Sequence, residues 1–123
     1  MEMVIAVGFG GAAGAILRWL IGILTNNLTN QAVWGTLSVN LVGSFLVGFL
    51  FICFQGKLPV SDVLRTGILV GLLGGFTTFS TFSMETVNMM MVGLHARAMI
   101  YIVASVALCL AGTWVGVAVA RWL

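Results

Sequence analysis

Four long apolar stretches take up almost the whole sequence, and they constrain the fold more than any other feature. The chain has 123 residues, of which 61% are hydrophobic and only 7% are charged. A soluble domain carries roughly 25% charged residues, so this chain has too few polar groups to cover its surface in water. A membrane-spanning helix needs about 20 apolar residues. The sequence therefore predicts an all-α membrane protein in which four transmembrane helices nearly exhaust the chain.

The spans can be placed from the apolar stretches and the short polar connections between them. We expect them at about residues 3–24, 33–54, 63–88 and 97–121, within a single transmembrane domain that covers residues 1–123. The connections "TNNLTNQA", "QGKLPVS" and "MMMVGLHA" are too short to be domains. The only proline, Pro59, lies in the second connection, where it interrupts no helix.

The basic residues are divided almost evenly between the two sides that a four-span topology creates. One side holds Lys57, Arg65 and Arg121, and the other holds Arg97 together with Arg18 if that side chain leans toward the first connection. Lys and Arg in short loops normally set orientation, so two hypotheses remain. Either partners hold a weakly biased chain in one orientation, or the chain inserts both ways and pairs with its own inverted copy, which would supply the symmetry of an inverted repeat. The formal net charge of +2 gives no reason to expect a nucleic-acid partner.

Small residues recur at four-residue spacing in every span. Helices in lipid associate through close packing at such positions. Because four helices alone have too little interior to bury so many small faces, we expect a tight bundle and an oligomer. The pairs and series are Gly10 with Gly14, Ser44 with Gly48, Gly67 with Gly71 and Gly75, and Gly112 with Gly116 and Ala120.

Two strongly polar residues lie at membrane depth in the first two spans. Such residues are expensive in lipid and often line a path or bind a ligand. Arg18 lies in the second half of the first span, where it could instead reach the interface with its long side chain. Asn40 lies about two turns into the second span. Its amide could bond a neighbouring helix, or its two N–H groups could bind an anion without carrying charge.

The fourth span carries a polar stripe made of Tyr101, Ser105, Cys109 and Thr113. Residues four apart lie on one helix face. Hydroxyl groups in helices often bond back to their own carbonyls, but a stripe of this length favours a polar track or a seam between helices. The thiols of Cys53 and Cys109 both fall inside spans, so we expect buried free thiols and no disulfide.

The stretch "GGFTTFSTFS", residues 74–83, predicts a break in the third helix. The pair Gly74-Gly75 followed by threonines is poor helix material. A break in lipid leaves backbone groups unpaired, and this is tolerated only where they face protein, water or an ion. Free carbonyls that point to one spot would suit a hard cation such as Na⁺.

Beyond the predicted break, Phe79 and Phe82 share one helix face. Such a pair can simply pack in the core. The edge of an aromatic ring is electropositive, however, so rings presented edge-on can attract an anion. The hydroxyls of Ser80 and Thr81 would supply donors beside them.

These residues together resemble a known family. The stretches "GGFTTFSTFS", "WGTLSVNLVGSF" and "GGAAGAILRW" are similar to the Fluc (CrcB) fluoride channels, and the resemblance covers essentially the whole chain. It implies a fluoride-selective channel that exports fluoride by passive electrodiffusion. It also implies an antiparallel, dual-topology homodimer of four-helix subunits, with two fluoride pathways and a structural Na⁺ at the dimer interface. We expect a multi-pass protein of the bacterial cell inner membrane, embedded in the lipid bilayer.

The resemblance also assigns roles to individual residues. It places Na⁺ on the backbone carbonyls of Gly74 and Thr77, and it places Arg18 and Glu85 at the vestibule, where Arg18 has a structural or vestibular role. The thiol of Cys109 departs from the hydroxyl expected at that position. The residues that the resemblance and the polar pattern place on the fluoride pathway are Asn40, Phe79, Ser80, Thr81, Phe82, Tyr101, Ser105, Cys109 and Thr113.

Three other functions fit the sequence less well. A small dual-topology multidrug or cation exporter needs a carboxylate deep in the membrane, whereas Glu2, Asp62 and Glu85 are all expected at or near span ends. A non-transporting membrane subunit would leave the helix break and the polar stripe unexplained. An enzyme is not expected, because the only histidine, His95, falls in a connection and no nucleophile and base lie at catalytic spacing.

Overall fold

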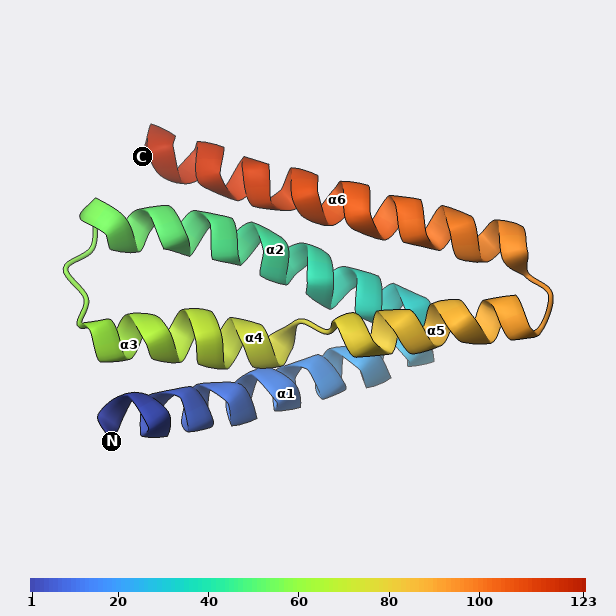
Figure 1. Cartoon of the computed structure of the whole chain (residues 1–123), viewed down its shortest axis with the longest axis horizontal. Helices are drawn as coiled ribbons and strands as arrows, with labels where there is room; N and C mark the ends of the chain where they lie inside the picture. The colour runs from blue at the N-terminus through green and yellow to red at the C-terminus, as the bar shows by residue number, and fades with distance from the viewer.

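The computed structural model describes all residues from 1 to 123 and consists of helices joined by short connections (Figure 1). Four helical segments are long and apolar enough to cross a membrane, and the third of them is interrupted. The prediction of four transmembrane helices with a break in the third is therefore confirmed. In chain order the elements are α1 (Glu2–Thr29), α2 (Ala32–Gly56), α3 (Asp62–Thr66), the π-helix η1 (Gly67–Leu72), α4 (Leu73–Phe76), α5 (Phe79–Met91) and α6 (His95–Trp122).

Two of the predicted connections are wrong in extent. Helix α1 continues to Thr29, so the first connection shrinks to two residues, with Asn30 in the left-handed conformation at a φ of 54°. At the other hairpin, α5 continues to Met91 and α6 already begins at His95, which is therefore a helical residue. The hydrocarbon core is about 30 Å thick but the whole bilayer is about 40–45 Å. Helices can thus continue past their apolar core, which is why the apolar stretches alone place the ends too early.

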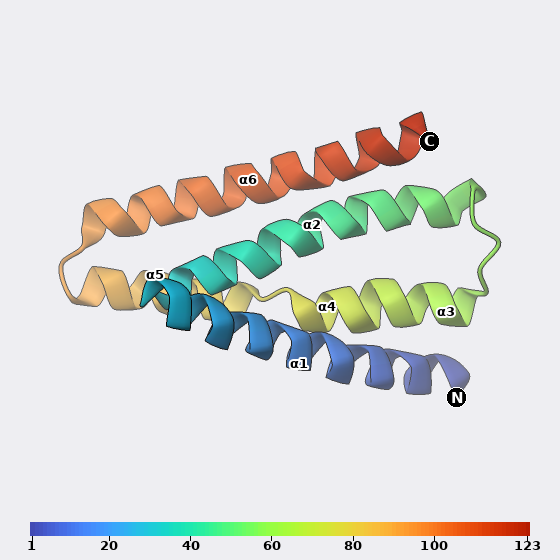
Figure 2. The ribbon, with the colours of Figure 1, turned by 180° about the vertical axis from the view of Figure 1, so that it is seen from behind.

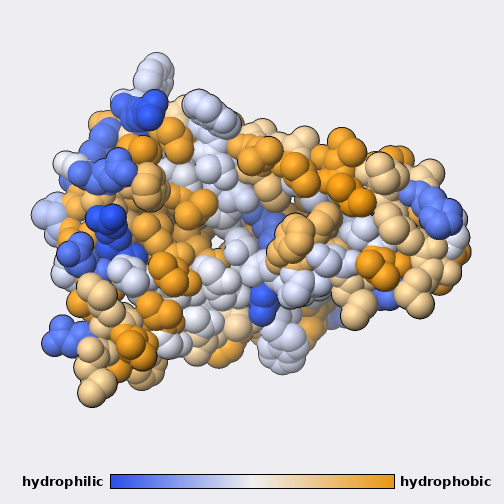
Figure 3. All heavy atoms as spheres, viewed as in Figure 1, coloured by the Kyte–Doolittle hydropathy of each residue, from blue (hydrophilic) through white to orange (hydrophobic).

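The long segments lie side by side with α1 crossing beneath them; α2 and α6 run in one direction, and α1 and the third span run in the opposite direction (Figures 1 and 2). Helix α2 packs along α6, while α1 packs against η1 and α4. Both termini and the connection from α2 to α3 lie at one end of the bundle, and the other two connections lie at the opposite end. Figure 3 shows hydrophobic residues over much of the length, with hydrophilic residues gathered mainly at the two ends. This distribution is the one that a bilayer requires.

The small-residue faces pack inside this one chain, which corrects the argument that they require an oligomer. A Cβ atom on Gly10 would overlap the Gly67 carbonyl oxygen, and one on Gly75 would lie 2.5 Å from the Gly11 carbonyl oxygen. Between α2 and α6, a Cβ atom on Gly48 would likewise overlap backbone atoms of the facing helix. Backbones approach this closely only where side chains are absent. The glycine faces therefore build the four-helix unit, and any case for a dimer must rest on other features.

Candidate functional site

The third span breaks at its threonines, not at the glycine pair that predicted the break. Gly74 and Gly75 belong to α4, whereas Thr77 and Thr78 are extended, with ψ angles of 158° and 118°. Glycine tolerates both conformations, so close packing of Gly75 on α1 can keep the pair helical. The β-branched threonines then carry the extended backbone. The expected break is therefore present within residues 74–83, at the threonines that follow the glycine pair.

The side-chain amide of Asn40, in α2, replaces the hydrogen-bond partners that the Thr78 backbone would have in an unbroken helix. Its Nδ2 donates to the Thr78 carbonyl oxygen at 2.9 Å, and its Oδ1 accepts from the Thr78 N–H at 2.8 Å. This two-way bond compensates backbone groups that lipid could not satisfy. These bonds agree with the hypothesis that Asn40 bonds a neighbouring helix. One N–H of the amide remains outside this pair and is left as a donor for a ligand.

Arg18 of α1 reaches the same break from the other side. Its Nη1 donates to the Thr77 carbonyl oxygen at 3.1 Å. The side chain thus extends across to the third span, so the alternative in which it only reaches the membrane interface is wrong. Asn40 and Arg18 together hold the two extended residues from two different helices.

The hydroxyl of Thr78 organises the start of α5. Its Oγ1 accepts from the Thr81 N–H at 3.2 Å and so caps the helix. The same oxygen lies 3.0 Å from Thr81 Oγ1 and 3.2 Å from Ser80 Oγ. The predicted donors Ser80 and Thr81 are therefore gathered on Thr78, a residue that the sequence analysis did not single out. Its signal was available, since Thr78 lies at the centre of the predicted break.

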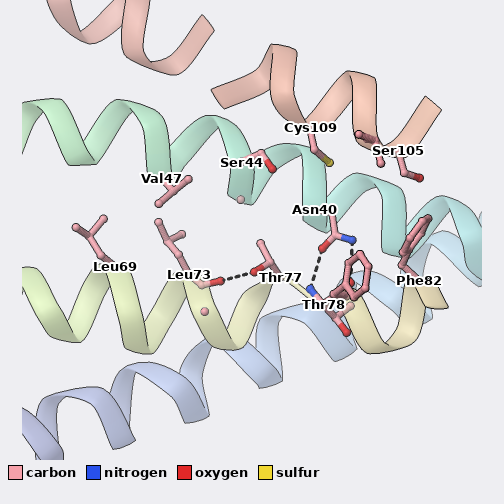
Figure 4. Close-up of a pocket in the computed structure, with 14 residues that line it drawn as sticks. Asn40, Ser44, Val47, Leu69, Leu73, Thr77, Thr78, Phe82, Ser105 and Cys109 are labelled. Carbon is pink, nitrogen blue, oxygen red and sulfur yellow. Dashed lines mark hydrogen bonds between the residues drawn. The ribbon is translucent and has the colours of Figure 1, made fainter. Parts of the chain in front are cut away.

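A cavity of about 450 Å³ opens beside the break and brings seven of the predicted residues together (Figure 4). None of its lining residues is charged, and its polar groups come from α2, the third span and α6. We call it the neutral cavity. Its walls are formed by Asn40, Gly43, Ser44, Val47, Leu69, Leu73, Gly74, Thr77, Thr78, Phe79, Phe82, Ser105, Val106 and Cys109.

The two phenylalanines on this wall differ in their surroundings. Their ring centroids are 5.4 Å apart and the rings are tilted by 48°. Phe82 is only 9% exposed and packs against the Tyr101 ring, with centroids 5.2 Å apart. Phe79 is 77% exposed. Phe82 therefore has the core contacts that the packing hypothesis expects, whereas Phe79 has few contacts inside one chain.

A second cavity of about 460 Å³ contains the charged residues of the site. Arg18, Thr81 and Glu85 line it, and Thr78 lines both cavities. We call it the charged cavity. Glu85 accepts hydrogen bonds from Thr36 Oγ1 at 2.8 Å and from the Tyr101 hydroxyl at 2.7 Å. Glu85 lies in the middle of α5, the second part of the third span, and bonds to two other helices.

Thr36 is a further residue of the site that was not predicted from the sequence, although its spacing from Asn40 indicated it. It lies four residues before Asn40 and therefore on the same face of α2. Its hydroxyl bonds Glu85, so this face of α2 reaches both cavities.

The polar stripe of α6 is not one continuous track, because its residues have three different surroundings. Tyr101 donates to Glu85 and lies outside the neutral cavity. Ser105 and Cys109 line that cavity, and Cys109 is only half-buried, which corrects the expectation of a buried thiol. Thr113 Oγ1 is 3.1 Å from both the Ser44 and the Cys109 carbonyl oxygens and so joins α6 to α2. Both predicted alternatives, a lining and a helix seam, apply to different parts of the stripe.

The backbone of the break offers carbonyl oxygens of the kind that a hard cation prefers. The Thr78 N–H, which would bond the Gly74 carbonyl in an unbroken helix, donates to Asn40 instead. Gly74 lines the neutral cavity, and nothing lies within 4 Å of a Cβ placed on it. The Thr77 oxygen accepts from Arg18 but has a second lone pair. These two oxygens can contribute to a cation site, although one chain alone supplies only part of a coordination shell.

The fold and the two cavities define a class of protein: a small multi-pass membrane protein with a broken helix whose polar lining is largely neutral. The family described as "CrcB-like protein, Camphor Resistance (CrcB)" matches residues 5–117. A "Fluoride-specific ion channel FluC" of Geobacter sulfurreducens is 43% identical over 124 residues and covers 100% of both chains. Another of that name, from Magnetococcus marinus, is 45% identical over 116 residues, or 94% of each chain. The chain belongs to the CrcB family, as the resemblance predicted.

Proposed function

We propose that the chain conducts fluoride across the membrane as a selective, passive channel. The observation that carries this conclusion is its similarity, over essentially the full length, to proteins named as fluoride-specific ion channels. The neutral cavity agrees with it, because an ion that moves by electrodiffusion needs sites it can both enter and leave. Membership of a channel family also argues against the exporter hypothesis.

We infer a fluoride route that links the charged cavity to the neutral cavity past Thr78. Fluoride gives up hydration water along such a route, so donors must replace that water at each step. We infer that the remaining N–H of Asn40, the hydroxyls of Ser80 and Thr81, and the edges of the two phenylalanine rings do this. In support, Asn40 and both rings line the neutral cavity, Thr81 lines the charged cavity, and Ser80 contacts Thr78. Ser105 and Cys109 continue the lining on α6. A narrow route of this kind excludes larger anions by size.

Four predicted residues act on this route from its margins. Tyr101 holds Glu85 and packs on Phe82. Arg18 and Glu85 form the vestibule in the charged cavity, where the guanidinium attracts an anion and also holds the break. Thr113 offers no free hydroxyl and instead stabilises the wall between α6 and α2.

We further propose that two chains assemble as an antiparallel, dual-topology homodimer. Three features support a second copy: the nearly even distribution of basic residues, the exposed ring of Phe79 on the cavity wall, and the open space around Gly74. In the dimer, a structural Na⁺ would be held by the carbonyl oxygens of Gly74 and Thr77 from both chains. Two fluoride routes would then flank the cation, whose charge offsets part of the cost of an anion in lipid.

Fluoride efflux from liposomes tests the function. Vesicles that hold the purified protein should release fluoride rapidly and chloride very slowly, as measured with ion-selective electrodes. Equal rates for both anions would contradict the narrow, neutral-donor route. For the assembly, an accessible tag at the C-terminus should be found on both sides of the membrane in cells. Tags confined to one side would exclude dual topology without bearing on conduction.

A further inference from the structure

Ser44 lies on the wall of the neutral cavity, one helical turn beyond Asn40. From the sequence it was expected only as a small residue at which helices pack closely. The residue is half-buried, and its Oγ has no hydrogen-bond partner although it keeps accessible surface. Hydroxyl groups in helices often bond back to backbone carbonyls of their own helix, as those of Thr77 and Thr113 do. Ser44 does not, so its hydroxyl is free to bind a ligand.

The direction in which Ser44 faces follows from the residues one turn to either side of it. Asn40 bonds the Thr78 backbone in the third span. A Cβ atom on Gly48 would overlap backbone atoms of Thr113 in α6. Because residues four apart differ by about 40° around an α-helix, Ser44 lies midway between the face that meets the third span and the face that meets α6. It therefore faces the space between these two helices, where the neutral cavity lies (Figure 4).

The other hydroxyls that line the neutral cavity are already engaged or enclosed. Thr77 Oγ1 donates to the Leu73 carbonyl oxygen at 3.0 Å. Thr78 Oγ1 lies within hydrogen-bond distance of two neighbouring hydroxyls. Ser105 Oγ has almost no accessible surface. Ser44 thus offers the one free O–H donor on this wall.

An ion that has left Asn40 needs such a donor at the next step. One helical turn advances it by about 5.4 Å along α2. Loss of hydration water without a new partner is costly. A neutral hydroxyl supplies one hydrogen bond and no fixed charge, so it binds an anion weakly enough to release it. Figure 4 shows that the wall beyond Ser44 is apolar, with side chains of Val47, Leu69 and Leu73.

We propose that Ser44 is a fluoride-coordinating residue, whose hydroxyl donates to the ion in the step that follows Asn40. Its role rests on the proposed function and extends the route along α2, away from the charged cavity. It makes Ser44 a determinant of the fluoride rate, because a small and strongly hydrated ion loses most where a donor is missing. The Ser44 carbonyl oxygen, which accepts from Thr113, is a separate contact that joins α2 to α6.

Fluoride efflux from liposomes and the melting temperature in detergent should be measured for three variants of the full chain. Ser44→Ala removes the hydroxyl but keeps the carbonyl oxygen that Thr113 bonds. Ser44→Thr keeps a hydroxyl at the same position. Ser38→Ala is the matched control, because Ser38 is also a half-buried serine of α2 but lines neither cavity.

Ser44→Ala should release fluoride about tenfold more slowly than the wild-type protein, as the loss of one hydrogen bond to a charged group predicts. Its melting temperature should equal that of Ser38→Ala. Ser44→Thr should recover most of the wild-type rate, and Ser38→Ala should conduct as the wild-type protein does.

A wild-type rate for Ser44→Ala would overturn the role of the hydroxyl while leaving the proposed function intact. A rate for Ser44→Thr as low as that of Ser44→Ala would also overturn it, because the hydroxyl would then not be what matters. Slow efflux by Ser44→Ala together with a melting temperature well below that of Ser38→Ala would show a packing role instead. A wild-type protein that releases no fluoride would refute the proposed function itself, and the role of Ser44 with it.

Discussion

The neutral cavity and the charged cavity have nearly the same volume, about 450 and 460 Å³, yet their chemistry differs. The first has no charged residue, whereas the second has one guanidinium and one carboxylate. Each of these groups hydrogen-bonds uncharged partners: Arg18 bonds a backbone carbonyl, and Glu85 bonds two hydroxyls. Thr78 is common to both cavities.

This difference indicates how a small anion can be both attracted and released. A fixed cation near the entrance raises the local concentration of anions. A fixed cation inside the narrow part would instead hold the anion and slow its exit, since conduction requires binding that is weak enough to reverse. Neutral donors in the narrow part replace hydration water without that penalty. On this proposal, the fixed cation of the charged cavity attracts the anion, and the anion exchanges its hydration water for neutral donors in the neutral cavity.

The largest effect is expected at Asn40, on the wall of the neutral cavity. Asn40→Leu leaves the N–H and C=O of Thr78 without partners, at a cost of about 1–3 kcal/mol for each buried group. Both fluoride efflux and thermal stability in detergent should fall sharply. Ser38→Ala in the same helix is the control, because Ser38 lines neither cavity. Full efflux by Asn40→Leu would show that its amide is not needed at the break.

A smaller effect, and one that separates conduction from folding, is expected at the two phenylalanines. Phe79→Ile should lower the melting temperature less than Phe82→Ile, because within one chain the Phe79 ring is 77% exposed, whereas Phe82→Ile should cost about 1 kcal/mol of packing. Both should lower efflux by about tenfold or more, equivalent to about 1.4 kcal/mol, because the ring edges are lost. Phe9→Ile, also at a ring that is 77% exposed but lines neither cavity, should conduct normally. Normal efflux by both Phe79→Ile and Phe82→Ile would show that the two rings only contribute packing.

A third effect, smaller than that of the phenylalanine variants, is expected in the charged cavity. Glu85→Leu and Tyr101→Phe each remove the bond between these residues, at about 1.5–3 kcal/mol for a hydrogen bond to a charged group. Efflux should fall less than in the phenylalanine variants, since we propose that these residues act at the margin of the route. The double variant should lose less stability than the sum of the two, as residues in one network do. Strict additivity in a double-mutant cycle would mean that the two side chains do not interact.

The smallest effect is expected at Thr113. Thr113→Val removes a hydroxyl that joins α6 to the Ser44 carbonyl, and such bonds in membranes average about 0.6 kcal/mol. Efflux should stay within about twofold of the wild-type rate. A loss as large as that of Phe79→Ile would place the Thr113 hydroxyl on the fluoride route itself.

The sequence alone determined the membrane class, the number of spans, the existence of a break and most of the residues around it. These features follow from local properties: apolar length decides spanning, and a run of β-branched residues after a glycine pair disfavours helix. A partner for Asn40 was likewise expected, because a polar side chain at membrane depth needs one, but the sequence did not indicate which helix supplies it.

Only the tertiary structure decided which partner each group has. Gly75 packs on the Gly11 backbone and stays helical, so the break moves to Thr77 and Thr78. Glu85 accepts hydrogen bonds from hydroxyls of both α2 and α6, which converge on it from distant parts of the chain. The stripe of α6 divides between a cavity and a seam because α2 faces only part of it. Each outcome depends on contacts between residues far apart in the chain, and local spacing carries no information about which helices meet or how closely they approach.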